Sequence, residues 1–96
     1  MIKFDENLLV GEDVKKRKLA RIMRRLENGK VSPGVWIITN PTNEANVFDM
    51  FEAKLLIFSY YKKRETTVFA IAKSREKAEA LLLELIEQKY GVSSDT

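Results

Sequence analysis

The chain contains no cysteine among its 96 residues. Without cysteine, no disulfide can brace the fold, and no thiolate can act as a nucleophile or a metal ligand. The sequence also lacks a long apolar run near its start, as in a secretory signal, and any stretch approaching the roughly 20 apolar residues that span a bilayer. We therefore predict a cytoplasmic protein with no membrane partner.

Histidine is absent as well. This removes the most frequent general base, the most frequent metal ligand and the side chain that titrates near neutral pH. The four glycines are scattered, so no glycine-rich phosphate loop is present. Enzymes that use only carboxylates, lysines, tyrosines and serines are a minority. We predict no enzymatic activity and no cofactor, and we assign no catalytic, cofactor-binding or metal-ligating residue.

The length of the chain allows one hydrophobic core and is too short for two. Hydrophobic residues make up 45% of the sequence and charged residues 32%, a balance typical of a folded rather than a disordered chain. The last residues are polar and have little to bury. We predict a single domain over residues 1–92 and a flexible C-terminal tail over residues 93–96.

Two stretches have the apolar spacing of amphipathic helices. The first covers residues 12–28, with acids in its first turn and Gly29 after it as a left-handed cap. The second follows Ser74, which suits an N-cap, and ends at Tyr90 and Gly91. The apolar stripes comprise Leu19, Ile22, Met23 and Leu26 in the first helix and Ala78, Leu81, Leu82, Leu85 and Ile86 in the second.

Strands are predicted at residues 35–39, 46–52 and 66–72, which are rich in β-branched and aromatic residues. A turn at residues 40–43 makes the first two a hairpin. In the third, alternation places Val68, Ala70 and Ala72 on one face and Phe69 and Ile71 on the other. Residues 2–4 add at most an extended piece.

The remaining segment, residues 53–63, suits either a helix or a strand. Good helix formers at its start and three basic residues at its end favour a short helix. The predicted fold is therefore α+β, in the order helix, strand, strand, short helix, strand, helix. A small three-stranded, mostly antiparallel sheet packs against two long amphipathic helices and the short helix.

Three segments together resemble known sequences: VWIITNP at residues 35–41, LLIFSYYKK at residues 55–63 and VFAIAKS at residues 68–74. Their apolar patterning and two aromatic-basic segments are similar to those of a family of small bacterial proteins of unknown function. This resemblance implies a bacterial cytosolic protein with no assigned activity, and it transfers no functional residue.

Positive charge is concentrated in one segment. Residues 12–30 carry eight basic and three acidic residues, a net charge of +5, whereas the rest of the chain carries −2. Lys15, Lys18, Arg21 and Arg25 are three or four residues apart, so they line one exposed helical face that can contact the phosphates of a nucleic acid. The alternative is a solvated helix whose cations offset acids elsewhere, such as the glutamates of the last helix. The sequence favours that alternative, because no signature of a nucleic-acid-binding fold accompanies the helix.

Three further features admit a functional interpretation. Residues 58–64 place aromatics beside cations, as in base-stacking surfaces, although the same pattern anchors a helix end to a core. Glu44, Asp49 and Glu52 are candidates for a cation site, but positions three apart in a strand face opposite sides. Trp36 is predicted to be a core residue.

The best prediction from the sequence is a small non-catalytic binding or regulatory module. The alternative is a weak nucleic-acid-binding protein that uses the basic helix, and a third hypothesis is a small-ligand protein that uses Asp49, Glu52 or Tyr61. A homodimer is also predicted, because a three-stranded sheet leaves free edges and a second face to cover.

Overall fold

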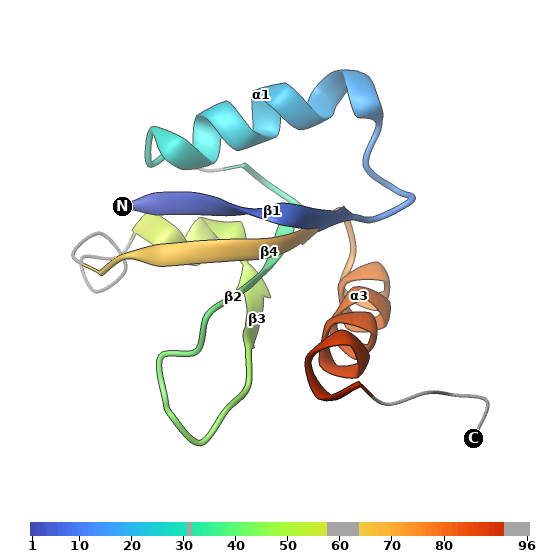
Figure 1. Cartoon of the computed structure of the whole chain (residues 1–96). Coiled ribbons are helices and arrows are strands. Elements are labelled where there is room, and N and C mark those ends of the chain that lie inside the picture. Colours follow the sequence, from blue (N-terminus) through green and yellow to red (C-terminus); the bar gives the residue numbers. More distant parts are fainter. Residues whose placement is uncertain (31, 58–63, 92–96) are drawn as a thin grey trace.

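The computed structural model describes residues 1–30, 32–57 and 64–91, so the predicted tail at residues 93–96 lies outside the described residues. The fold is α+β, with helix α1 on one face of a mixed sheet and helix α3 on the other (Figure 1). In chain order the elements are β1 (Ile2–Val10), α1 (Lys16–Glu27), β2 (Trp36–Thr39), β3 (Asp49–Glu52), the 3-10 helix η1 (Ala53–Ile57), β4 (Thr66–Ala72) and α3 (Arg75–Tyr90).

The sheet has four strands in the order β1-β4-β2-β3. β4 pairs in parallel with β1 and antiparallel with β2, and β2 pairs antiparallel with β3. The predicted hairpin of the second and third strands is confirmed. The predicted three-stranded, mostly antiparallel sheet is wrong, because the N-terminal segment adds a parallel strand beside β4.

Most of β1 was not predicted, because apolar and polar side chains do not alternate regularly along it. Phe4 pairs with Val68 and Leu9 with Ala70, so five steps along β1 match only two along β4. The extra residues form a bulge, in which the Asp5 Oδ2 accepts a hydrogen bond of 3.0 Å from the backbone N–H of Asn7. A bulge of this kind interrupts the two-residue period from which strands are recognised.

β4 also carries a bulge. Phe69 has no partner on β2, because the residues on either side of it pair with consecutive residues of that strand. As a result Val68 and Ile71 pack in the core on the α1 side, whereas Phe69 and Ala70 pack on the α3 side. The predicted strict alternation along this strand is therefore wrong.

The first helix begins at Lys16, four residues later than predicted. The preceding residues form a turn, in which the Val14 N–H donates to the Gly11 carbonyl at 3.0 Å and Val14 is buried. The Asp13 Oδ2 accepts a hydrogen bond of 2.9 Å from the Ser74 hydroxyl. This acid is therefore used in a tertiary contact rather than in the first turn of the helix.

The helix ends follow the predicted cap signals. Gly29 and Gly91 adopt φ angles of +69° and +66°, the left-handed conformation expected after a helix. The Ser74 hydroxyl accepts a hydrogen bond of 3.2 Å from the Lys77 N–H, as an N-cap does. The short helix is confirmed as η1, and the rest of its predicted range, residues 58–63, lies outside the described residues.

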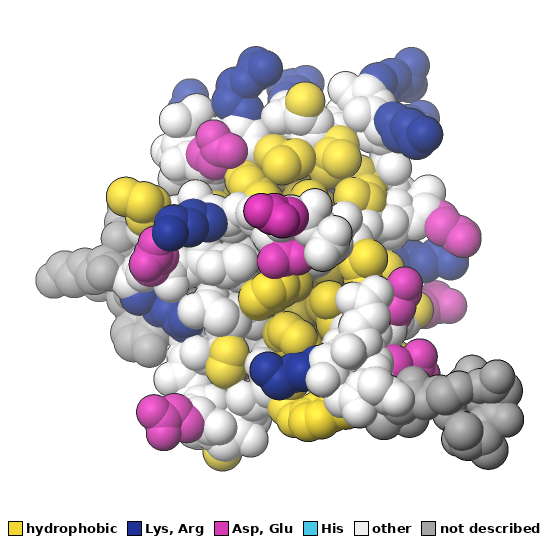
Figure 2. Space-filling model, viewed as in Figure 1, with side chains coloured by type: hydrophobic (Ala, Val, Ile, Leu, Met, Phe, Trp, Pro, Cys, Tyr) yellow, Lys and Arg dark blue, Asp and Glu magenta, His cyan; other side chains and the backbone are white. Residues whose placement is uncertain are grey.

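The sheet is covered by apolar side chains on both faces. Ile22 and Leu26 of α1 pack on the face that carries Ile37, whereas Leu85 of α3 packs on the face that carries Ile38. Figure 2 shows hydrophobic side chains in the two bands above and below the β1 edge, towards α1 and α3. The two amphipathic helices thus pack their apolar sides on the sheet as predicted. They lie on opposite faces, so the expectation that the second face needs covering by a partner is wrong.

Candidate anion-binding groove beside α1

One flank of α1 is lined with cations. Ile22 and Leu26 face the core, and Lys18, Arg21 and Arg25 lie along the flank next to Ile22, because residues three, four and seven apart share a side of a helix. Figure 2 shows lysine and arginine side chains gathered around α1.

These three cations line a cavity of about 310 Å³ together with residues from two other parts of the chain. Ser32, Pro33 and Val35 come from the segment that enters β2, and Lys73 comes from the β4–α3 connection. Among the residues that the structure describes, the lining contains four cations and no carboxylate; these residues are Lys18, Arg21, Ile22, Arg25, Ser32, Pro33, Val35 and Lys73.

A smaller cavity of about 160 Å³ adjoins the first and shares Lys18, Ile22 and Lys73 with it. Lys15 and Asp13 also line this second cavity. We call the two cavities together the α1 groove. The structure therefore brings all four residues singled out in the sequence, Lys15, Lys18, Arg21 and Arg25, into one groove.

Lys73 was not identified from the sequence, although it lines both cavities. Its Nζ lies close to the turn before β2: a Cβ added at Gly34 would be 3.9 Å from it. Gly34 has a φ of +75°, which a side chain would strain. Lys73 and Arg21 are 52 positions apart, and the packing of α1 on the sheet that contains β4 brings them to one cavity.

Four of the groove cations lack acidic partners within the described segments. Lys15, Lys18, Arg21 and Lys73 make no ion pair there, whereas Arg75 pairs with Glu79 of its own helix at 3.0 Å. Because α1 and α3 cover opposite faces of the sheet, the glutamates of α3 do not neutralise this flank (Figure 1). The positive charge of these four side chains is therefore left for an external anion to balance.

A buried hydroxyl in the groove wall also lacks a partner. Ser32 is only 5% exposed, and its Oγ has no hydrogen-bond partner in residues 1–30, 32–57 and 64–91. Leaving a buried hydroxyl unpaired costs about 1–3 kcal/mol. Asp13 Oδ1, in the wall of the smaller cavity, is likewise buried and unpaired among these residues. A ligand oxygen would accept a hydrogen bond from the Ser32 hydroxyl, whereas the Asp13 carboxylate, which only accepts hydrogen bonds, would repel an anion in the smaller cavity.

The other candidates from the sequence do not converge. The Asp49 Oδ2 accepts from the Thr42 N–H at 3.0 Å, whereas the Glu52 Oε2 lies 3.5 Å from the Lys54 Nζ. Within the part of the chain that the structure describes, no three acidic side chains are grouped to hold a metal ion. Trp36 is half-buried.

The aromatic-basic segment, including Tyr61, lies outside the described residues except for its last member, Arg64. The Arg64 Nη2 donates to the carbonyls of Asn40 and Pro41 at 3.4 and 3.3 Å. These bonds tie the segment before β4 to the turn after β2. Arg64 therefore has a structural role.

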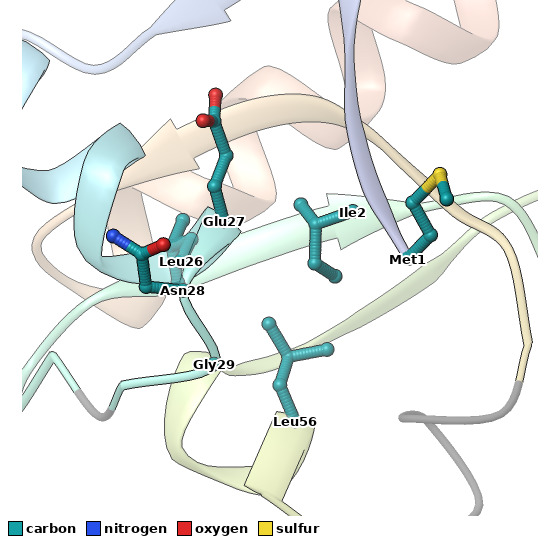
Figure 3. Close-up of a pocket in the computed structure, with 7 residues that line it drawn as sticks. All are labelled: Met1, Ile2, Leu26, Glu27, Asn28, Gly29 and Leu56. Atoms are coloured by element: carbon teal, nitrogen blue, oxygen red, sulfur yellow. The ribbon is translucent and has the colours of Figure 1, made fainter.

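A cavity of about 330 Å³ lies at the other end of the α1 side, between the start of β1, the end of α1 and η1 (Figure 3). Ile2 and Leu56 face each other across it, and the carboxylate of Glu27 extends away from it. No polar side chains of the described residues converge on this space, so it offers no set of hydrogen-bonding groups to orient a ligand.

Comparison of the chain with protein families, curated proteins and solved structures finds no match. The resemblance to small bacterial proteins, the bacterial origin and the cytoplasmic location stay predictions. Among the described helices, none is long and apolar enough to cross a bilayer. The α1 groove is therefore the feature of the described residues that best indicates a function.

Proposed function

We propose that the protein is a non-catalytic binding module that holds the phosphate groups of a nucleic acid in the α1 groove. One observation carries the proposal: Lys18, Arg21, Arg25 and Lys73 line a single cavity, and no carboxylate lines it in the described part of the chain. The sequence favoured a solvated helix, but the structure supports the nucleic-acid alternative better, because a cation from a distant loop joins the helix flank.

The shape of the groove suits contact with a nucleic-acid backbone. Lys15 and Arg25 are ten residues apart, which corresponds to about 15 Å along a helix and is long enough to follow several phosphates. Contacts of this kind position a strand and give salt-dependent binding without reading the base sequence. The protein is therefore expected to bind single-stranded and duplex nucleic acids without sequence preference.

The experiment is a fluorescence anisotropy titration of labelled oligonucleotides at low salt. The test variant is Lys18→Glu/Arg21→Glu, which reverses two groove charges. The matched control is Arg17→Glu/Arg24→Glu, which makes the same charge change at two exposed positions that do not line the groove cavities. We expect a loss of at least tenfold in affinity for the first pair and less than threefold for the control. Absence of binding by the unmodified protein, or equal losses for both pairs, would reject the proposal.

The homodimer is a separate proposal. Of the two reasons for predicting it, the free edges of the sheet and its uncovered second face, the fold supports only the first. α3 covers the second face of the sheet, so that face needs no partner. The outer edges of β1 and β3 remain, although the bulge of β1 interrupts its row of backbone groups available to a second copy. Light scattering supports the dimer if it gives a mass twice the 11.1 kDa of the chain, and a single species of 11.1 kDa rejects it.

A further inference from the structure

We propose that the larger cavity of the α1 groove takes a terminal phosphate, a phosphomonoester, in preference to the internal phosphodiesters of a strand. This inference rests on the proposed function and makes it more specific. The phosphomonoester is either the end of a nucleic-acid strand or part of a small phosphorylated metabolite, and the experiment below distinguishes these sources.

The charge of the cavity supports a dianion. Within residues 1–30, 32–57 and 64–91, four cations and no carboxylate line a space of about 310 Å³. A phosphomonoester carries about −1.5 to −2 charges at pH 7 and three strong acceptor oxygens, whereas each internal phosphate of a strand carries one negative charge. The Arg21 guanidinium presents paired N–H donors that match two phosphate oxygens, and the Lys18 and Lys73 ammonium groups add point charges. Lys18, Arg21 and Lys73 make no ion pair within the described segments, and an internal phosphodiester would leave more of their charge unbalanced.

Ser32 supplies a neutral hydrogen-bonding group in the same wall. Its hydroxyl is buried and unpaired among the described residues, and the residue lines the cavity. A serine side chain has one torsion angle with three staggered positions, and a position that faces the cavity would let the Ser32 hydroxyl donate to a bound oxygen. The terminal phosphate has one more acceptor oxygen than an internal one to receive this hydrogen bond.

The remaining walls suit the group attached to the phosphate. Ile22 and Val35 are buried apolar residues of the lining, and Pro33 is exposed in it. The cavity volume lies at the lower end of the range for small-ligand sites, roughly 300–1,000 Å³. The phosphate and the unit that bears it therefore occupy the cavity, and a continuing strand leaves along the smaller cavity past Lys15.

The experiment compares two 3′-labelled single-stranded oligonucleotides of one sequence, with a 5′-phosphate or a 5′-hydroxyl, by fluorescence anisotropy. We expect the phosphorylated strand to bind about tenfold more tightly. Ser32→Ala and Lys73→Met should each reduce this preference to less than threefold. Lys30→Met is the control, because Lys30 is an exposed cation that does not line the cavity. Urea unfolding of each variant checks that the fold is retained.

A nucleoside 5′-monophosphate, titrated by calorimetry, identifies the source of the phosphomonoester. If this compound binds and Lys73→Met abolishes binding, the cavity assignment is supported with a small metabolite as its ligand. If neither strand binds while the monophosphate binds, the nucleic-acid function is rejected and the cavity assignment is kept. If both strands bind equally and the monophosphate does not bind, the terminal-phosphate inference is overturned and the proposed function stands.

Discussion

Gly11 lies where the chain leaves β1, and the space beside its α-carbon is already occupied. A Cβ at this position would lie 2.6 Å from the Asp13 Oδ1 and 3.2 Å from the Ala72 Cβ. Gly11→Ala must therefore displace the Asp13 carboxylate, and we expect it to lower the free energy of unfolding by about 1–3 kcal/mol. Urea denaturation followed by the fluorescence of Trp36, the only tryptophan, measures this change.

The double-mutant cycle with Asp13→Ala tests the stated cause. Removing the carboxylate removes the closest obstacle to the new methyl group, so Gly11→Ala should cost less in the Asp13→Ala background. An undiminished cost in that background would mean that the destabilisation has another origin.

Lys3 and Glu65 form an exposed ion pair that links the start of β1 to the residue before β4. The hydrogen bond from Lys3, together with its positive charge, lowers the pKa of the Glu65 carboxyl below its ordinary value. A carboxyl whose pKa is depressed by folding stabilises the protein above its unfolded pKa, and this stabilisation is lost as the pH falls through the folded pKa. The contribution is small, because both side chains are exposed and solvated.

We therefore expect Lys3→Ala to raise the Glu65 pKa towards its ordinary value, as measured by NMR titration of the carboxyl carbon. The unfolding free energies of the two proteins should converge at acid pH, where Glu65 is protonated in both. Lys54→Ala, which removes the partner of a different glutamate, should leave the Glu65 pKa unchanged. A Glu65 pKa insensitive to Lys3→Ala would contradict the ion pair.

At the scale of elements, Ser74 joins the start of α3 to the turn before α1. Its hydroxyl accepts from the Lys77 N–H at 3.2 Å and donates to the Asp13 Oδ2 at 2.9 Å. Ser74→Ala removes both bonds, and we expect a loss of about 1–2 kcal/mol in the free energy of unfolding. Ser74→Asn is the comparison variant, because its amide offers both an acceptor and a donor. An alanine variant as stable as the asparagine variant would rule out the double role.

Elements whose ends carry local signals were predicted well. α3 has a hydroxyl before it and a glycine after it, and its boundaries agree with the sequence. The start of α1 was predicted too early because an acid before an apolar stripe is typical of the first turn of a helix. Asp13 instead accepts a hydrogen bond from Ser74. A tertiary hydrogen bond to a residue 61 positions away leaves no local pattern.

The strands were predictable where β-branched and aromatic residues are concentrated or where a turn joins two such runs. β2 and its hairpin partner were found, whereas β1 was almost entirely missed because three extra residues between Phe4 and Leu9 break its period. The bulge at Phe69 likewise reversed the expected faces of the residues after it. A bulge depends on the pairing register of two strands, so it cannot be predicted from the sequence of one strand alone.

The candidate site was predictable in the same limited way. Residues on one helix keep a fixed spacing, so the positions of Lys15, Lys18, Arg21 and Arg25 along α1 indicated a shared flank. Lys73 reaches that flank because α1 packs on the sheet beside the end of β4, and Ser32 reaches it through the turn before β2. No fixed interval in the sequence relates either residue to the cations of α1. The helix spacing therefore identified one wall of the groove, and the fold supplied the other.

For the whole molecule, the distribution of charge has more effect than its total. The chain carries a net +3, yet residues 12–30 carry +5 and the remainder is acidic. The three-layer arrangement keeps these parts apart, because the sheet separates α1 from the glutamates of α3 (Figure 1). An approaching polyanion is therefore attracted to one side and repelled from the other, which orients it before contact.

This arrangement makes a quantitative prediction about salt. Each phosphate that a cation neutralises on a single strand contributes about −0.7 to the slope of log K against log salt concentration. Because the groove offers several cations along α1 and one from Lys73, we expect a slope between about −2 and −3.5 for a single-stranded oligonucleotide. Arg21→Gln should reduce the magnitude of this slope by about 0.7, because it removes one phosphate contact.

Arg24→Gln is the matched control, since Arg24 is an exposed arginine of the same helix that does not line the groove. Its slope should equal that of the unmodified protein, because a cation that touches no phosphate releases no counterion on binding. Equal reductions for the two variants would show that the strand lies over the whole outer surface of α1, with no preference for the flank beside Lys73. An affinity that does not change with salt would exclude phosphate contacts altogether.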